Sequence, residues 1–281
     1  MGIYARRRVT NWLVITLSVL ATGFGLLWLV LVLSTLLVNG VVAITPALFT
    51  EMTPPPGSSG GLLNAIAGSL AMTAIATLVG TPTGILAGTF LAEYARGRFG
   101  DIIRFTADIL NGVPSIVIGI VAYGIVVLRQ RHFSALAGGV ALAIMMVPTI
   151  TRATEEMLLL VPTTVREAAY GLGVSRWRTT LSITLRTATS GVITGVMLAF
   201  ARIAGETAPL LFTAFGNTYW NWNVNQPTAA LPLQIFVYAI SPFDEWHRQA
   251  WAGALVLIVL IVISVSAVRI AAGRGMLKGT S

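Results

Sequence analysis

The sequence of 281 residues contains no cysteine, a single lysine, Lys278, and two histidines, His132 and His247. The absence of cysteine excludes a disulfide framework, a thiolate metal site and a thiol nucleophile. The two histidines lie far apart in short polar stretches, which favours interfacial side chains over metal ligands. Lys278 is not part of a phosphate-binding loop of the form G-x-x-x-x-G-K-[ST], so the chain lacks this means of hydrolysing ATP.

Charged residues are also scarce. They make up 10% of the chain, against 56% hydrophobic residues, whereas a soluble domain carries about 25% charged residues. The chain has too few charges to cover a water-facing surface, so it is an integral membrane protein. The net charge of +8 comes without any basic run longer than Arg6-Arg7-Arg8, which indicates contact with anionic lipid and no binding of nucleic acid.

Six stretches are long and apolar enough to cross a bilayer, which takes about 20 residues. The sequence therefore predicts an all-α polytopic membrane protein with about six transmembrane helices in one domain over residues 1–281. The third stretch is interrupted at residues 111–114, Asn-Gly-Val-Pro. The predicted spans are residues 12–38, 62–94, 109–128, 136–157, 187–212 and 251–270.

Lysine and arginine residues indicate the orientation. Fourteen of them, Arg96, Lys278 and both terminal clusters included, fall on the face that holds the termini, and only Arg129, Arg131 and Arg248 fall on the other. The positive-inside rule therefore places both termini in the cytoplasm.

A polar segment at residues 162–185 follows the fourth span and is too charged to cross lipid. Thr164 and Glu167 have the spacing of a capping box, which predicts a short helix that starts near Thr164. Gly171 and Gly173 are expected to end this helix, and Ser175 to cap the next one. The segment is predicted to form a helical finger on the cytoplasmic face.

The finger resembles the E-A-A motif of binding-protein-dependent ABC importer permeases: E-A-A, three residues, Gly, nine residues, then I-x-L-P. The matching residues are Glu167, Ala168, Ala169, Gly173, Ile183 and Leu185, whereas Arg186 replaces the proline. The resemblance implies that the finger is a coupling helix that docks on an ATPase, and that the fold is that of a type I ABC importer permease. On local physics alone, Glu167 is equally well explained as a helix cap and the alanines as helix-favouring residues.

Four further stretches are similar to the A-type permease subunits of high-affinity phosphate importers: FTEMTPPP (49–56), GTPTGILAGTFLAEY (80–94), LNGVPSIVIGI (110–120) and RIAGETAPLLFTA (202–214). This similarity implies phosphate import across the cytoplasmic (inner) membrane of a prokaryote. It also implies four kinds of partner: a second homologous permease, two copies of a cytoplasmic ATPase that bind ATP and Mg²⁺, an external phosphate-binding protein, and membrane lipid. The chain itself is then a non-catalytic subunit without a bound cofactor.

Arg202 and Glu206 lie four residues apart in the fifth predicted span, which would place them on one helical face about 5–6 Å apart. Ionisable side chains at such depth seldom face lipid. Arginine offers a planar fork of donors to an oxyanion, Glu206 offers an acceptor for the proton that hydrogen phosphate carries and sulfate lacks, and Thr207 adds a hydroxyl. The alternative is an intrahelical salt bridge, or pairing with a charge of the sister subunit.

Other polar residues have more than one interpretation. Asp108 and Asn111 flank the break in the third span and either gate it or cap a helix. Glu93 is expected to be interfacial. Glu155 and Glu156, at the cytoplasmic mouth, are expected to pair with Arg152 or with the ATPase.

Two other functions stay open. One is a permease for another oxyanion, such as sulfate or molybdate. The other is a proton-coupled secondary transporter in which Arg202 and Glu206 act as a relay; the finger argues against it, because a self-sufficient carrier needs no ATPase-docking helix. An ion channel or a purely structural membrane protein fits the sequence less well.

Overall fold

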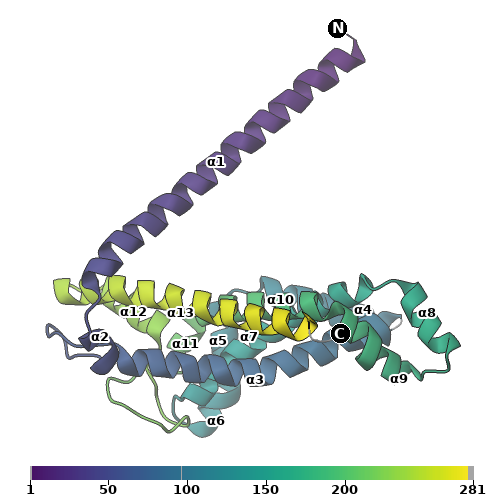
Figure 1. The fold of residues 1–281 in the computed structure, drawn as a ribbon. Coiled ribbons are helices and arrows are strands. Elements are labelled where there is room, and N and C mark those ends of the chain that lie inside the picture. The colour runs from purple at the N-terminus through teal and green to yellow at the C-terminus, as the bar shows by residue number, and fades with distance from the viewer. Residues whose placement is uncertain (1, 96, 278–281) are drawn as a thin grey trace.

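The computed structural model describes residues 2–95 and 97–277, so Arg96 and Lys278, two of the charges that predict the orientation, lie outside the described residues. Within these ranges the regular structure is helical, as the sequence predicts (Figure 1). The helices are α1 (Ile3–Ala43), α2 (Ala47–Thr50), α3 (Leu63–Glu93), α4 (Arg98–Gly112), α5 (Ser115–Ala122), η1 (Tyr123–Val127), α6 (Leu128–Gln130), α7 (Ala135–Leu159), α8 (Thr163–Gly171), α9 (Arg176–Thr179), η2 (Thr180–Thr184), α10 (Leu185–Ala204), α11 (Ala208–Leu211), α12 (Leu231–Ala239) and α13 (Asp244–Leu277).

In the described part of the chain, five helical stretches are long and apolar enough to cross a membrane, and there are up to six if the bent pair Arg98–Gly112 and Ser115–Gln130 counts as one span. The two halves of that pair meet at an angle of 107°. Pro114 explains the bend, because it lacks an N–H for the helix ladder and forces the preceding residue, Val113, into an extended conformation. The third span is thus broken at the predicted place, but its first half begins at Arg98 and carries charged residues.

The core of the bundle is the packing of α3 along α7. Close approach is possible because glycines line the contact: a Cβ atom on Gly84 would lie 2.6 Å from Cβ of Ile150, and one on Gly88 would lie 2.4 Å from the carbonyl oxygen of Thr151. Small residues at helix interfaces allow the van der Waals contact on which helix association in a membrane depends. The two helices therefore form one tightly packed unit.

The fifth span differs from the prediction for residues 187–212. A helical stretch runs from Arg176 to Ala204, 29 residues, and contains the π-helical segment η2. It ends at Gly205, after which the chain is irregular until α11 begins at Ala208. Residues 176–185, predicted to belong to the cytoplasmic segment, are therefore the first turns of this span. The threonine hydroxyls in these turns donate to backbone carbonyls of the same segment, so their polar groups are satisfied locally.

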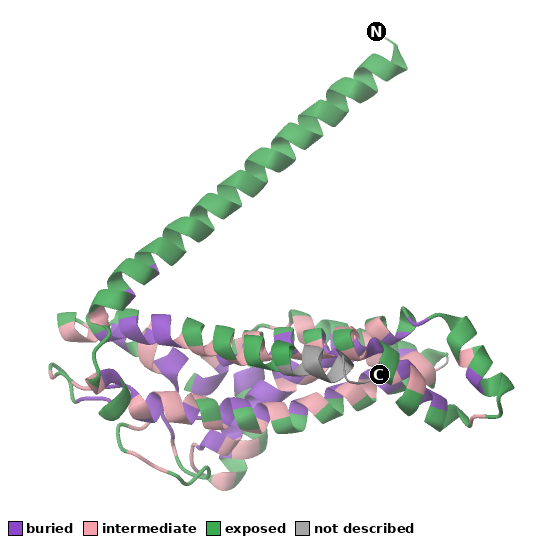
Figure 2. Cartoon of the chain, viewed as in Figure 1, coloured by how far each residue is buried: buried purple, intermediate pink, exposed green. Residues whose placement is uncertain are grey.

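Helix α1 extends away from the bundle and contacts it near its C-terminal end, where Gly40 packs against Leu255 of α13 (Figure 1). Figure 2 shows α1 exposed along almost its whole length, in contrast to the buried residues of the bundle. Helix α12 forms between the predicted fifth and sixth spans, and α13 begins at Asp244, before the predicted start of the sixth span at residue 251. The apolar surface of α1 is therefore not covered by the described part of this chain.

Candidate functional site

The predicted finger is formed by α8 and α9, which project from one end of the bundle (Figure 1). Glu167, Ala168 and Ala169 lie on α8, and Gly173 follows its end. The N–H of Gly173 donates to the carbonyl of Tyr170 and the N–H of Val174 donates to the carbonyl of Ala169. These two bonds form a Schellman motif, which requires a left-handed residue at Gly173, and its φ is 78°.

The start of α8 corrects the capping-box prediction. The helix begins at Thr163, with Pro162 at the N-cap, and no side chain caps it. Proline fixes its own φ near the helical value, so the helix starts one residue earlier and Thr164 lies inside the first turn. Ser175 occupies the N-cap of α9 as predicted, but its side chain makes no capping bond there.

The tip of the finger is open on the side away from the bundle. Glu167 and Ala168 are exposed, and Leu172 is 84% exposed. Ala169 is buried instead, so only one of the two motif alanines is available to a partner. The finger therefore presents a small, mostly apolar surface with one carboxylate at its side.

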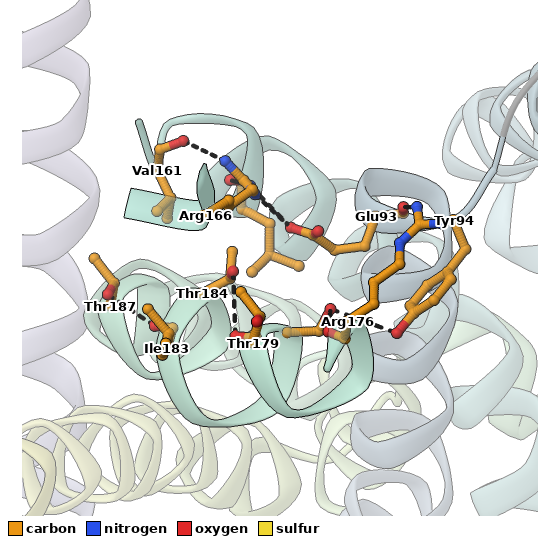
Figure 3. A network of polar contacts seen from close by, with 11 residues as sticks. Glu93, Tyr94, Val161, Arg166, Arg176, Thr179, Ile183, Thr184 and Thr187 are labelled. Carbon is orange, nitrogen blue, oxygen red and sulfur yellow. Dashed lines mark hydrogen bonds and ion pairs between the residues drawn. The ribbon is translucent and has the colours of Figure 1, made fainter. Parts of the chain in front are cut away.

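The finger is attached to the bundle by an ion pair that the sequence analysis missed. Nη2 of Arg166 lies 2.8 Å from Oε1 of Glu93, the last residue of α3, and Nε lies 3.0 Å from the same oxygen (Figure 3). The side chain of Glu93 is 5% exposed and that of Arg166 is 14% exposed. Glu93, which the sequence predicts only to be interfacial, is thus the buried anchor of α8.

Three contacts join α9 and η2 to the same end of α3. Arg176 donates to the carbonyl oxygen of Glu93, and its guanidinium lies 4.7 Å from the ring centroid of Tyr94. The hydroxyl groups of Tyr94 and Thr180 lie 3.4 Å apart. In Figure 3, Arg166 and Arg176 reach Glu93 from opposite sides.

Arg186 stands at the end of the motif in place of proline. The chain makes no turn there: it passes from η2 directly into α10. Arginine has a backbone N–H that proline lacks, so the helix ladder continues through this position. One extra residue is accommodated in the π-helical turns of η2.

Arg202 and Glu206 do not share a helical face. Arg202 is in the last turn of α10 and exposed, whereas Glu206 follows the helix end at Gly205 and is half-buried. Within the described ranges neither side chain has an ion-pair partner in this chain. The intrahelical salt bridge is therefore wrong, because the glycine ends the helix between the two residues.

Thr207 comes directly after Glu206, at the N-cap of α11. Its carbonyl accepts the N–H groups of Leu210 and Leu211, and its side chain makes no capping bond. The next turn packs tightly on the other broken span, since a Cβ on Gly119 of α5 would lie 2.6 Å from Cα of Pro209. Irregular backbone in a membrane bundle occurs where it is buried in protein or lines a polar cavity. The segment with Glu206 and Thr207 is irregular and half-buried.

Asp108 and Asn111 are both tied to α7. Oδ1 of Asp108 forms an ion pair with Nε of Arg152, 2.9 Å away, and Asn111 accepts a hydrogen bond from the hydroxyl of Thr149 at 2.8 Å. Neither residue caps a helix, so the capping interpretation is wrong. These contacts hold α4 against α7 just before the break at Pro114.

Glu155 pairs with Arg152 as predicted, at 2.5 Å. It also accepts from Arg104 of α4, and Arg104 donates in turn to the carbonyl of Leu91 near the end of α3. Glu156, the neighbouring carboxylate, is exposed. The last turn of α3, the middle of α4 and the C-terminal part of α7 are thus joined by one buried carboxylate and two arginines.

A helical bundle with broken spans and an exposed finger at one end has the architecture of an ABC importer permease. The chain superimposes with a TM-score of 0.64 on a chain of a bacterial alginate ABC transporter, crystallised in complex with an alginate pentasaccharide-bound periplasmic protein. The two share 12% sequence identity, and the match covers 94% of each chain. At this identity the similarity concerns the fold.

Sequence comparison is more specific. The family described as binding-protein-dependent transport system inner membrane component matches residues 80–274. The phosphate transport system permease protein PstA of Haemophilus influenzae is 50% identical, with 92% of this chain and 91% of that protein covered. PstA of Yersinia pestis is 49% identical, covering 92% of this chain and 88% of that protein. The chain belongs to the family of binding-protein-dependent transport system inner-membrane components and, within it, to the PstA permeases.

Proposed function

We propose that this chain is a permease subunit of an ATP-driven importer that moves inorganic phosphate across the cytoplasmic membrane of a prokaryote. The observation that carries the proposal is its identity of about half of all positions with permeases named for phosphate transport, over 92% of the chain. The chain itself is non-catalytic in this proposal. Partner subunits bind ATP and Mg²⁺ and hydrolyse the nucleotide.

The finger is the proposed docking element for one copy of the ATPase subunit. The sister permease would dock the second copy. Glu167, Ala168 and the exposed Leu172 offer a convex tip, and the Schellman motif at Gly173 fixes its shape. A small exposed residue such as Ala168 lets a partner surface approach the helix closely. The positive-inside count of the sequence supports the same side, the cytoplasm, for the finger and both termini.

A second, homologous permease subunit is proposed to pack against the surface that holds Arg202. Arg202 is exposed in the last turn of α10, and ionisable side chains within membrane spans seldom face lipid. The apolar length of α1 is exposed as well. Lipid suits α1, whereas Arg202 requires a polar partner or a water-filled path at the interface with the second subunit.

Arg202, Glu206 and Thr207 are proposed to line the phosphate path. Because Glu206 and Arg202 form no ion pair among the described residues, the guanidinium keeps its donors available for an oxyanion. Glu206 repels a fully ionised anion such as sulfate but accepts the proton of hydrogen phosphate, which favours phosphate. Asp108 and Asn111 are the proposed gate: opening at the α4–α5 break would have to release their contacts with Arg152 and Thr149.

The test is phosphate uptake by proteoliposomes that hold the purified complex, with and without ATP and the external phosphate-binding protein. We expect uptake to require both. ATP-dependent uptake of sulfate or molybdate in place of phosphate would assign another oxyanion. Uptake by this chain alone, driven by a proton gradient, would identify a secondary transporter and overturn the proposal.

A further inference from the structure

Three arginines from three separate segments converge on the last residues of α3. Arg104 of α4 donates to the carbonyl of Leu91 at 3.0 Å, Arg166 of α8 binds the carboxylate of Glu93, and Arg176 of α9 donates to the carbonyl of Glu93. The C-terminal carbonyls of a helix have no partner within the helix and carry partial negative charge, so they attract cations. The end of α3 is therefore a junction between the finger and the bundle.

Arg166 is the most connected member of this junction. Its Nη1 donates to the carbonyl of Val161 at 2.5 Å, and its Nη2 donates to the carbonyl of Leu158 at 2.8 Å. One guanidinium on α8 thus binds the end of α3 through Glu93 and the end of α7 through these carbonyls (Figure 3). Only the fork of arginine can serve so many acceptors at fixed angles; the ammonium of lysine cannot.

Burial makes the link stiff. Glu93 and Arg166 are shielded from water by the ends of α3, α7 and α8, so moving the finger away from α3 would leave a buried charge without a partner. On the bundle side, the glycine contacts hold α3 tightly against α7. A displacement of α8 is therefore passed to α3 and α7 together.

We propose that Glu93 is a positioning residue for energy coupling: through its ion pair with Arg166, movement of the finger is transmitted to the α3–α7 unit. The inference rests on the proposed function, since it assumes that a partner ATPase moves the finger. Glu93 touches neither nucleotide nor substrate in this scheme. Its loss should separate ATP hydrolysis from transport and leave hydrolysis in place.

The experiment compares the assembled complex carrying the wild-type chain, Glu93→Gln, Glu93→Asp or Glu245→Gln in proteoliposomes. Glu245 is the matched control, because the same substitution there removes a carboxylate from an exposed ion pair with Arg248. Two rates are measured per assembled complex: phosphate uptake, and ATP hydrolysis stimulated by the binding protein. Coupling between protein sites corresponds to about 5- to 150-fold effects, so we expect Glu93→Gln to lower phosphate moved per ATP at least about fivefold.

Glu93→Asp keeps the charge and should retain most of the wild-type ratio of phosphate moved to ATP hydrolysed. Glu245→Gln should give the same ratio as the wild type. A merely structural role would lower uptake and hydrolysis together and leave their ratio unchanged. A ratio for Glu93→Gln within twofold of the wild type would overturn the inference. If the wild-type complex itself shows no ATP-dependent uptake, the proposed function has failed instead, so the two failures are distinct.

A second measurement covers the case in which Glu93→Gln assembles poorly. The chain has no cysteine, so the pair Glu93→Cys and Arg166→Cys can be joined by a bifunctional thiol reagent in the assembled complex. A tether that raises the ratio of phosphate to ATP above that of the untethered pair supports the link. A tether that forms and leaves the ratio low overturns it.

Discussion

The carboxylate of Glu155, on α7, lies 2.5 Å from Nε of Arg104, on α4. The same carboxylate reaches Arg152 one turn earlier on its own helix, and its side chain is 2% exposed. A carboxylate buried to this extent is tolerated because both of its oxygens accept charged donors. Glu155 is therefore the point at which α4 is joined to the C-terminal part of α7.

The first prediction concerns this network. Glu155→Gln keeps the size of the side chain but removes the charge that holds Arg104 and Arg152, which remain partly exposed and can be hydrated. We expect a loss of about 2 kcal/mol in the free energy of unfolding in detergent. Asp101→Asn is the control: Asp101 also pairs with Arg104 but is 73% exposed, and its loss should cost at most about 1 kcal/mol. Equal losses for the two variants would contradict a special role for Glu155.

The second prediction concerns the contact of α3 with α7. A Cβ on Gly84 would lie 2.6 Å from Cβ of Ile150, so Gly84→Ala must push the helices apart. We expect it to lower the unfolding free energy by about 1–3 kcal/mol. Gly23, in the middle of α1, has nothing within 4 Å of a Cβ, and Gly23→Ala should raise helix stability by about 0.5–1 kcal/mol. Thermal unfolding of both variants decides the matter, and a neutral Gly84→Ala would show that the helices are not in tight contact.

The third prediction concerns the end of α8. Gly173 has a φ of 78°, a conformation that costs an alanine about 1–2 kcal/mol. Gly173→Ala should therefore loosen the Schellman motif and speed hydrogen exchange of the amides of Gly173 and Val174. Gly171 has open space at its Cβ and no positive φ, so Gly171→Ala should leave these amides as protected as in the wild type. Faster exchange in both variants would mean that the finger depends on small size at its tip instead of on backbone conformation.

The fourth prediction concerns Arg202. If its free guanidinium binds the oxyanion, Arg202→Gln should lower phosphate uptake by the assembled complex about 10- to 100-fold, the range for hydrogen bonds to a charged group. Arg202→Lys keeps the charge but not the planar fork of donors, so its rate of phosphate uptake should lie between those of the wild type and Arg202→Gln. Arg248→Gln, an exposed arginine paired with Glu245, is the control and should transport at the wild-type rate. Wild-type uptake by Arg202→Gln would remove Arg202 from the path.

Some features followed from residue types and spacing alone. The scarcity of charge required a membrane protein, because no packing arrangement can cover a water-facing surface without polar side chains. Pro114 and Gly173 fixed a helix break and a helix end through their own backbones, whatever surrounds them. The spacing from Glu167 to Gly173 placed the finger for the same reason, since a short helix and its glycine end are local structures.

Only the tertiary structure decided which charges meet. Glu93 and Arg166 are 73 residues apart, and Arg104 and Glu155 are 51 apart. Their pairing depends on how α3, α4, α7 and α8 pack, a result of the summed contacts of whole helices and not of any local pattern. Conversely, Arg202 and Glu206 are close in sequence but separated by a helix end at Gly205. The sequence determined that most charges lie near the ends of the spans or between them. The fold determined that those near the end of α3 join the finger to the bundle.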